Sequence, residues 1–110
     1  MKLISSLIRP DRLDAVRRGL KGMNVCALTV VEVKDHSPQD HGTTVWKGRA
    51  FSVEASLKME IQVVVHDDDV DRVIDLIMST ARTGIAGDGH VCVMPVEHRY
   101  DIRTGLREVS

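Results

Sequence analysis

The stretch that decides the fold is residues 57–81, LKMEIQVVVHDDDVDRVIDLIMSTA, in which the apolar residues change from a period of two to a helical period. In its first part, charged or amide side chains stand between apolar ones as far as Gln62. This alternation predicts an antiparallel strand over 57–65, with one face in the core and the other wet or kept for a ligand or another subunit. In its second part, one helical stripe predicts a helix through Val70, Val73, Ile74, Ile77, Met78 and Ala81. The aspartates at 67–69 precede this stripe, so we expect them to cap the helix and to interact with its dipole.

Two strands and a helix are predicted before this stretch. The apolar runs at 3–8 and 25–34 have the length and composition of strands. Between them, we expect a helix that begins near Pro10 and stops at Gly22, because apolar residues recur at helical spacing at Leu13, Val16 and Leu20. After the second helix, the run at 91–96 predicts a fourth strand.

The element order is therefore strand, helix, strand, strand, helix, strand. This order predicts an α+β fold, the ferredoxin-like βαββαβ arrangement, with a four-stranded antiparallel sheet and two helices on one face. The other face of the sheet has no helix to cover it, so we expect the protein to form an oligomer. The length of 110 residues fits a single domain over 1–110.

The composition argues against several classes of function. The formal net charge is −1, without a basic stripe, so we expect no direct contact with nucleic acid. No apolar run approaches the roughly 20 residues of a membrane span, so we expect no membrane insertion. Cys26 and Cys92 lie in apolar runs and form no CxxC pair, which predicts two buried free thiols and a reducing, cytoplasmic location.

The segment between the second and third predicted strands, 35–56, is longer than the connection requires. Antiparallel neighbours can be joined by a two-residue turn, and long loops in compact domains are usually functional or disordered. The segment has no convincing periodicity, so it is either a mobile surface hairpin or a loop that binds a partner or is gated by a ligand. Trp46 and Phe51, two of the three aromatic residues in the chain, favour a partner-binding loop. A second, charged loop follows the last strand at 97–110.

A glycine-rich segment, TGIAGDGH at 83–90, lies between the second helix and the last strand. Its three glycines allow backbone N–H groups to approach an anion closely. The P-loop and dinucleotide fingerprints are absent, so the pattern is equally compatible with a tight turn and with a phosphate cradle. Arg82 and Arg103 favour the phosphate interpretation, because arginine forms two parallel hydrogen bonds with phosphate.

Several short motifs occur together along the chain. They are MKLI at 1–4, IRP at 8–10, LTVVEVK at 28–34, VDRV at 70–73, ARTG at 81–84, GDG at 87–89, PVE at 95–97 and IRTG at 102–105. With these motifs the chain resembles the PII signal-transduction proteins of nitrogen regulation. The resemblance runs without a gap from residue 1 to about 105. The glycine loop and the IRTG run are the most specific of these motifs.

The resemblance implies a homotrimer with three clefts between subunits, each binding ATP or ADP. The segment 35–56 would be the T-loop, which reaches a protein target, an enzyme or a transporter. Gln39 would help to bind magnesium and 2-oxoglutarate, and Lys58 would pair with a 2-oxoglutarate carboxylate. Thr29 would contact the base. The implied nucleotide-binding residues are Thr29, Lys58, Val64, Gly87, Asp88, Gly89, His90 and Arg103.

The T-loop departs from the family pattern. Phe51 stands where many bacterial members carry the tyrosine that is nucleotidylated, and phenylalanine has no hydroxyl, so that modification is impossible at this position. Trp46 replaces another usual tyrosine, and Pro38 replaces a usual arginine. Residues 40–42, DHG, replace a Lys-Gly-His run.

The implied phosphate site departs from the pattern too. His90 replaces a usual lysine and Asp101 a usual arginine, which removes most of two positive charges and adds a negative one. Each charge-assisted phosphate contact contributes about 1.5–3 kcal/mol, so we expect nucleotide binding with a weakened preference for ATP over ADP. Histidine changes its charge near neutrality, which predicts pH-sensitive binding. Arg99, on the same strand face as Asp101, is placed to offset part of the change.

Together these features predict a regulatory protein that binds adenine nucleotides, with 2-oxoglutarate, and controls a partner. The sequence offers no nucleophile–base pair or metal triad that suggests catalysis, so we expect at most a weak side ATPase activity. Two alternatives remain. One is a specialised paralogue that senses ADP, AMP or another small anion such as bicarbonate for a non-nitrogen transport system. The other is a metal-binding trimer of the same architecture, with His36 and His41 as ligands.

Overall fold

The structure is a computed structural model of the whole chain. It describes residues 1–36, 43–46, 49–52 and 56–108, with the backbone alone for Cys26 and for the two segments between 43 and 52.

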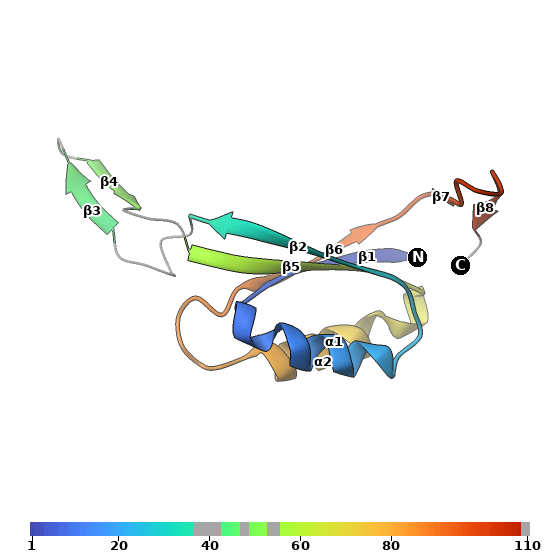
Figure 1. Cartoon of the computed structure of the whole chain (residues 1–110), viewed down its shortest axis with the longest axis horizontal. Coiled ribbons are helices and arrows are strands. Elements are labelled where there is room, and N and C mark those ends of the chain that lie inside the picture. Colours follow the sequence, from blue (N-terminus) through green and yellow to red (C-terminus); the bar gives the residue numbers. More distant parts are fainter. Residues whose placement is uncertain (37–42, 47–48, 53–55, 109–110) are drawn as a thin grey trace.

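Four strands form the central sheet. They are β1 (Lys2–Ile8), β2 (Val25–Asp35), β5 (Ser56–Val65) and β6 (His90–Pro95), and they lie in the order β2-β5-β1-β6 with every neighbouring pair antiparallel. Two helices, α1 (Leu13–Lys21) and α2 (Val70–Ala81), pack side by side on one face of this sheet (Figure 1). The predicted α+β architecture and element order are confirmed.

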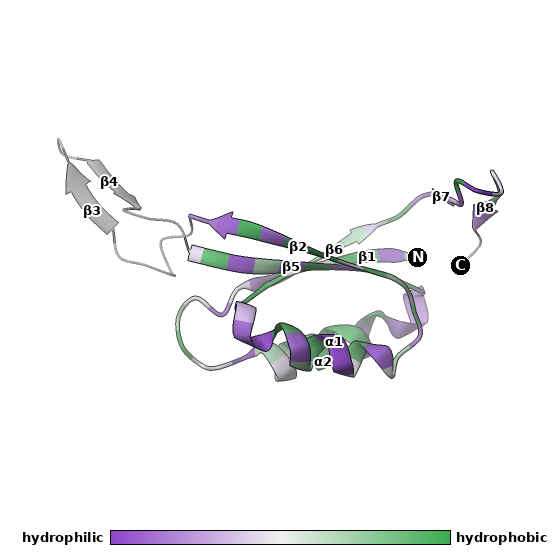
Figure 2. Ribbon diagram, viewed as in Figure 1, coloured by the Kyte–Doolittle hydropathy of each residue, from purple (hydrophilic) through white to green (hydrophobic). Residues whose placement is uncertain are grey.

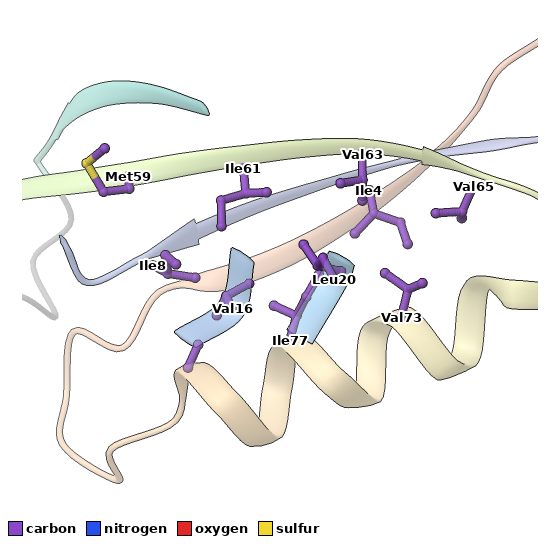
Figure 3. Close-up of a cluster of buried hydrophobic side chains, with 11 residues drawn as sticks. Ile4, Ile8, Val16, Leu20, Met59, Ile61, Val63, Val65, Val73 and Ile77 are labelled. Atoms are coloured by element: carbon purple, nitrogen blue, oxygen red, sulfur yellow. The ribbon is translucent and has the colours of Figure 1, made fainter. Parts of the chain in front are cut away.

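The core forms where the period-two strands meet the period-3.6 helices. In the strand register Ile4 lies opposite Val63 on β5 and opposite Val93 on β6, so alternate side chains face the helices. The apolar stripe of each helix turns toward the same layer (Figure 2). The residues buried in this layer are Ile4, Ile8, Val16, Leu20, Met59, Ile61, Val63, Val65, Val73, Ile77 and Ala81 (Figure 3).

The opposite face of the sheet is bare in the single chain (Figure 1). Leu3, Ser5 and Leu7 of β1 alternate with the buried residues and therefore lie on this face. Cys92, opposite Ser5 on the edge strand β6, also lies here and is exposed. The prediction of a buried thiol is therefore wrong for Cys92, because an apolar run does not reveal that its strand lies at the edge of the sheet. The side chain of Cys26 lies outside the described part of the structure.

Two small hairpins extend beyond the sheet. Strands β3 (Thr43–Trp46) and β4 (Arg49–Ser52) pair within the segment where no periodicity was found, and β7 (Arg99–Tyr100) and β8 (Arg107–Glu108) pair within the charged tail. The two hairpins lie at opposite ends of a molecule of 55 × 27 × 21 Å (Figure 1). The sequence left a surface hairpin open as one alternative for 35–56 but located none of these strands, since strands of two to four residues are too short to show alternation.

The entry into each helix also differs from the prediction. Short 3₁₀ turns, η1 (Pro10–Arg12) and η2 (Asp67–Asp69), precede the two α-helices. Asp69 is the N-cap residue of α2, but its side chain makes no capping hydrogen bond and instead accepts one from Arg72. The predicted side-chain cap is therefore wrong, because the carboxylate is engaged by the arginine three residues later. No helix in the described ranges is long and apolar enough to cross a membrane.

Candidate functional site

The glycine loop at 83–89 is organised around one carboxylate. Oδ2 of Asp88 accepts hydrogen bonds from the backbone N–H groups of Thr83 and Gly84, each at 2.9 Å. Oδ1 accepts hydrogen bonds from the Thr83 hydroxyl and from Nε of Arg9, the latter at 2.9 Å. These partners, the Thr83 hydroxyl first and Arg9 second, hold the pKa of Asp88 well below its usual range. Asp88 is therefore an anion that shapes the loop.

Arg9 ties the loop to the sheet. It follows the last residue of β1, and its Nη2 atom donates a hydrogen bond to the carbonyl of Ala86 at 2.6 Å. Together with the ion pair to Asp88, this contact fixes both ends of the segment 86–88 against the end of β1. Sequence reasoning did not assign Arg9 to the site. The only feature of the sequence that could have indicated a role for Arg9 is its place in the IRP motif, directly before the proline at which the first helix was expected to begin.

Glycine is required where the loop meets β1. Gly89 has a φ of +100°, and a Cβ atom there would lie 1.8 Å from the carbonyl oxygen of Leu7. Gly87 has a φ of +95°, a conformation that only glycine adopts without strain. The chain therefore turns sharply at 87–89 and passes directly against the strand before β6 begins.

A pocket of about 300 Å³ brings Lys58 and Gly87 together, as the resemblance implies. Arg9, Pro10 and Leu57 also line it. Lys58 is only 2% exposed, and its Nζ atom donates a hydrogen bond to the hydroxyl of Ser56 at 2.9 Å. We call this the Lys58 pocket. With two cations and a glycine backbone in its wall, it can hold a small anion.

The carboxylates around this pocket offset part of its charge. Asp11 lines it, and Oδ2 of Asp35 lies 3.8 Å from the Lys58 ammonium. A bound anion would therefore compete with Asp35 for Lys58. Asp35 is the last residue of β2, where the segment 35–56 begins, so this competition would act on the base of that segment.

Thr29, implied for the base, and Val64, also implied for nucleotide binding, lie on the bare sheet face. Thr29 lies opposite Gln62, and Val64 lies opposite Leu3, while His90 lies opposite Leu7. The β1 residues opposite Val64 and His90, Leu3 and Leu7, are four positions apart. At the rise of a β-strand this spacing is about 13 Å along β1. A ligand that touches both Val64 and His90 in one chain must lie along the bare face.

Arg103 lies at the far end of the molecule from the glycine loop. Strand β6 begins at His90, opposite Leu7, and ends at Pro95, opposite Lys2, so it leads away from the glycine loop along the whole of β1. The β7–β8 hairpin, which carries exposed Arg103 between its strands, follows at that distant end (Figure 1). One chain therefore does not bring Arg103 to Gly87, Gly89 or His90.

Asp101 builds the turn that carries Arg103. Its carboxylate accepts a hydrogen bond from the backbone N–H of Thr104 at 3.0 Å, and its carbonyl accepts one from Gly105 at 2.8 Å. Its own N–H donates to the carbonyl of Leu106 at 3.0 Å. The substitution at this position thus supplies a turn former as well as a negative charge.

Arg99 is engaged across the same hairpin. Its Nη1 atom forms an ion pair with Oε2 of Glu108 on β8. This partner offsets the charge of Arg99, which weakens the expectation that Arg99 compensates for Asp101.

Several predicted residues cannot be placed in this site. Gln39, Pro38 and His41 lie outside the described residues, and of Trp46 and Phe51 only the backbone is described, in β3 and β4. His36 is exposed. In the described part of the chain, no three histidine, cysteine or acidic side chains gather into a group that could hold a metal ion.

Comparisons with known proteins identify the family of this chain. The family described as "Nitrogen regulatory protein P-II" matches residues 1–106. A protein named "Nitrogen regulatory protein P-II" from Microchaete diplosiphon is 39% identical over 110 residues, which covers 100% of this chain and 98% of that protein. The protein of the same name from Nostoc punctiforme (strain ATCC 29133 / PCC 73102) matches to the same extent. The chain therefore belongs to the PII family, as a non-enzymatic signal-transduction protein of nitrogen regulation.

Proposed function

We propose that this protein binds ATP or ADP in clefts between the subunits of a homotrimer, together with Mg²⁺ and 2-oxoglutarate. Occupancy of the clefts then alters the T-loop, which controls a partner enzyme or transporter of nitrogen regulation. The protein works in the cytoplasm, as a single PII-like domain over 1–110.

One observation carries the proposal of a shared site. The glycine loop and Arg103 lie toward opposite ends of the folded molecule, although the family resemblance assigns both to the same phosphates. A second copy that places its β7–β8 hairpin beside the glycine loop of the first resolves this separation. Such head-to-tail contacts close into a ring when the rotation between copies allows it, and three copies then form three equivalent clefts. The bare sheet face supplies the apolar surface that assembly would bury.

Within each cleft, the glycine loop would act through its backbone. The Asp88 carboxylate already accepts the N–H groups of Thr83 and Gly84, so the donors for phosphate are those of the later loop, from Gly87 to His90. Thr29 and Val64 on the bare face would contact the base. Asp88 itself would position the loop rather than touch the nucleotide, because a carboxylate repels phosphate.

The Lys58 pocket would receive a carboxylate of 2-oxoglutarate. Lys58 would exchange its ion pair with Asp35 for one with the ligand, and Gln39 would help to hold Mg²⁺ and the keto acid. Because Asp35 is the last residue of β2, immediately before the T-loop, loss of its ion pair with Lys58 would change the start of the T-loop when the ligand binds.

The alternative of a paralogue that senses ADP, AMP or a small anion such as bicarbonate is favoured by one observation. Asp101 carries a negative charge in the turn beside Arg103, and Arg99 is neutralised by Glu108. The hairpin therefore brings less positive charge to the phosphates than its arginines suggest. A nucleotide with fewer phosphate groups, and so with less negative charge, then matches the positive charge of the cleft.

Calorimetric titration of ATP, ADP and AMP, with Mg²⁺ and with or without 2-oxoglutarate, tests the proposal. Tighter ATP binding in the presence of 2-oxoglutarate supports the nitrogen sensor. Binding that ignores 2-oxoglutarate, or that favours ADP or AMP, supports the paralogue. Absence of nucleotide binding contradicts both the nitrogen sensor and a paralogue that senses ADP or AMP.

A further inference from the structure

A second pocket, of about 140 Å³, lies on the other side of the glycine loop from the Lys58 pocket. Its walls come from the last turns of α2, the end of β1 and the start of β6, and we call it the α2–β6 pocket. Its apolar lining consists of Leu7, Ile8, Ile77, Met78, Ala81 and Val91. None of these residues is among those implied for nucleotide or 2-oxoglutarate.

The size and lining of this pocket limit what it can hold. An apolar cavity of about 150 Å³ accommodates a benzene molecule. The α2–β6 pocket has nearly that volume, at about 140 Å³, and Met78 at its rim is 43% exposed, so the pocket is open to solvent. A ligand therefore presents one apolar group of about the size of benzene, and any polar group it carries remains at the mouth.

The mouth selects a negative charge. Arg82 and His90 border the pocket and are exposed, and neither side chain has a hydrogen-bond or ion-pair partner among the residues that the structure describes. Arginine offers a planar set of donors that matches a carboxylate. An anion bound at the mouth would supply Arg82 with the partner that the described residues do not provide.

Asp88 is the one acidic residue in the lining, and it does not cancel this preference. Its oxygens accept three hydrogen bonds from Thr83 and Gly84 within the loop and a fourth from Arg9, whose guanidinium also pairs with its charge. The net charge left at the mouth is therefore that of Arg82.

We propose that the α2–β6 pocket binds a small monocarboxylate with an apolar body, in which the body occupies the space between α2 and β6 and the carboxylate pairs with Arg82. Asp88, Gly89 and His90 form one wall of the pocket, so the ligand would contact the back of the glycine loop. The pocket shares Asp88, Gly89 and His90 with the residues implied for nucleotide, but its apolar lining and Arg82 are not among them. The proposal does not depend on nucleotide binding.

The test uses benzoate as the probe and the full-length ¹⁵N-labelled protein, with amide chemical shifts recorded by NMR. We expect saturable shifts concentrated at Ala81, Arg82, Gly89 and Val91. Arg82→Gln should weaken benzoate binding by about fivefold, as expected for a charged contact at an exposed position. Arg18→Gln removes the same charge from an exposed position on α1 and should leave the affinity unchanged.

Benzyl alcohol, which has the same ring without the charge, separates the two parts of the proposal. Weaker binding of benzyl alcohol than of benzoate supports a carboxylate site. Equal binding of the two probes, together with no effect of Arg82→Gln, overturns it. An absence of shifts at the lining amides, for example because another copy of the chain covers the pocket, overturns it as well.

Discussion

Nε of Arg9 lies 2.9 Å from Oδ1 of Asp88, so a side chain at the end of the first strand holds a loop 79 residues later in the chain. The same carboxylate accepts the N–H groups of Thr83 and Gly84. One ion pair therefore sets both the shape of the glycine loop and its distance from the sheet. The Lys58 pocket and the α2–β6 pocket share this loop as a wall, so the shape of both depends on the pair.

Asp88→Asn should open the glycine loop. The amide nitrogen of asparagine donates rather than accepts, so it faces a donor in either orientation: the N–H groups of Thr83 and Gly84 at the Oδ2 position, or the Arg9 guanidinium at the Oδ1 position. We expect faster hydrogen exchange at Thr83 and Gly84 and weaker nucleotide binding, with little change elsewhere. Asp75→Asn, at an exposed position on α2, is the matched control. Unchanged exchange at Thr83 and Gly84 would contradict the assigned role of Asp88.

The loop should remain closed to unusually low pH. Because the pKa of Asp88 is lowered in the folded protein, its contribution to stability is complete above the ordinary carboxyl pKa of about 3.9 and is lost only as the pH falls through the lower folded value. A ¹³C NMR titration of the Asp88 carboxyl group measures this directly. A midpoint at or above about 4 would show that the hydrogen bonds to Thr83 and Arg9 do not hold the charged form.

Gly89→Ala should lower the free energy of unfolding by more than Gly84→Ala does. Both glycines have a positive φ, which costs a side-chain-bearing residue about 1–2 kcal/mol. At Gly84 a Cβ atom meets nothing within 4 Å, so the free energy of unfolding should fall by that amount alone. At Gly89 the Cβ atom would lie 1.8 Å from the Leu7 oxygen, and β1 or the loop must move. Equal losses in chemical denaturation would show that the loop does not pass against β1.

Replacing the neighbouring serines Ser5 and Ser6 of β1 by alanine should change the free energy of unfolding in opposite directions. Ser6 is fully buried, and its hydroxyl has no hydrogen-bond partner among the described residues, so Ser6→Ala should raise the free energy of unfolding by about 1 kcal/mol. Ser5 faces the other side of the sheet and donates a hydrogen bond to Glu60 at 2.9 Å, so Ser5→Ala should lower it by about 0.5–1.5 kcal/mol. Urea denaturation of the two variants measures both, and changes of the same sign would contradict the assigned strand faces.

Asp101→Asn should strengthen ATP binding. The asparagine oxygen can still accept the Thr104 N–H, so the turn is retained, while one negative charge beside Arg103 is removed. For a partly screened charge near the phosphates we expect about a threefold to tenfold gain in affinity, measured by calorimetry. If Asp101→Ala gives the same gain, the turn contributes nothing to the position of Arg103.

The sequence was sufficient for the elements with strong periodicity. The alternation through Met59, Ile61 and Val63 identified β5 with its buried face, and the stripe from Val70 to Ala81 identified α2. It was insufficient where structure depends on contacts between distant residues. The pair of Arg9 with Asp88 joins positions that no local pattern connects, and the exposure of Cys92 follows from the place of β6 at the edge of the sheet.

The candidate site was predicted in the same uneven way. Gly87 and Lys58 do line one pocket, as the family resemblance implied. The turn at Asp101 was missed because two of its three hydrogen bonds run between backbone groups that the sequence does not distinguish. The separation of Arg103 from the glycine loop required the order of the strands, since only the pairing of β6 with β1 shows that the chain leads away from the loop.

The central claim is that each nucleotide site combines the glycine loop of one copy with Arg103 of another, and mixed oligomers test it most directly. His90→Glu damages the loop side of a site, and Arg103→Glu damages the hairpin side, so each variant alone should bind ATP poorly. When the two chains are co-expressed in equal amounts, a shared site receives an intact loop and an intact hairpin by chance, and about one quarter of the sites should recover wild-type affinity. Calorimetric titration of the mixed oligomers with ATP measures the number of high-affinity sites per chain. No recovery would contradict the account, because it would mean that the loop and the arginine must belong to the same chain.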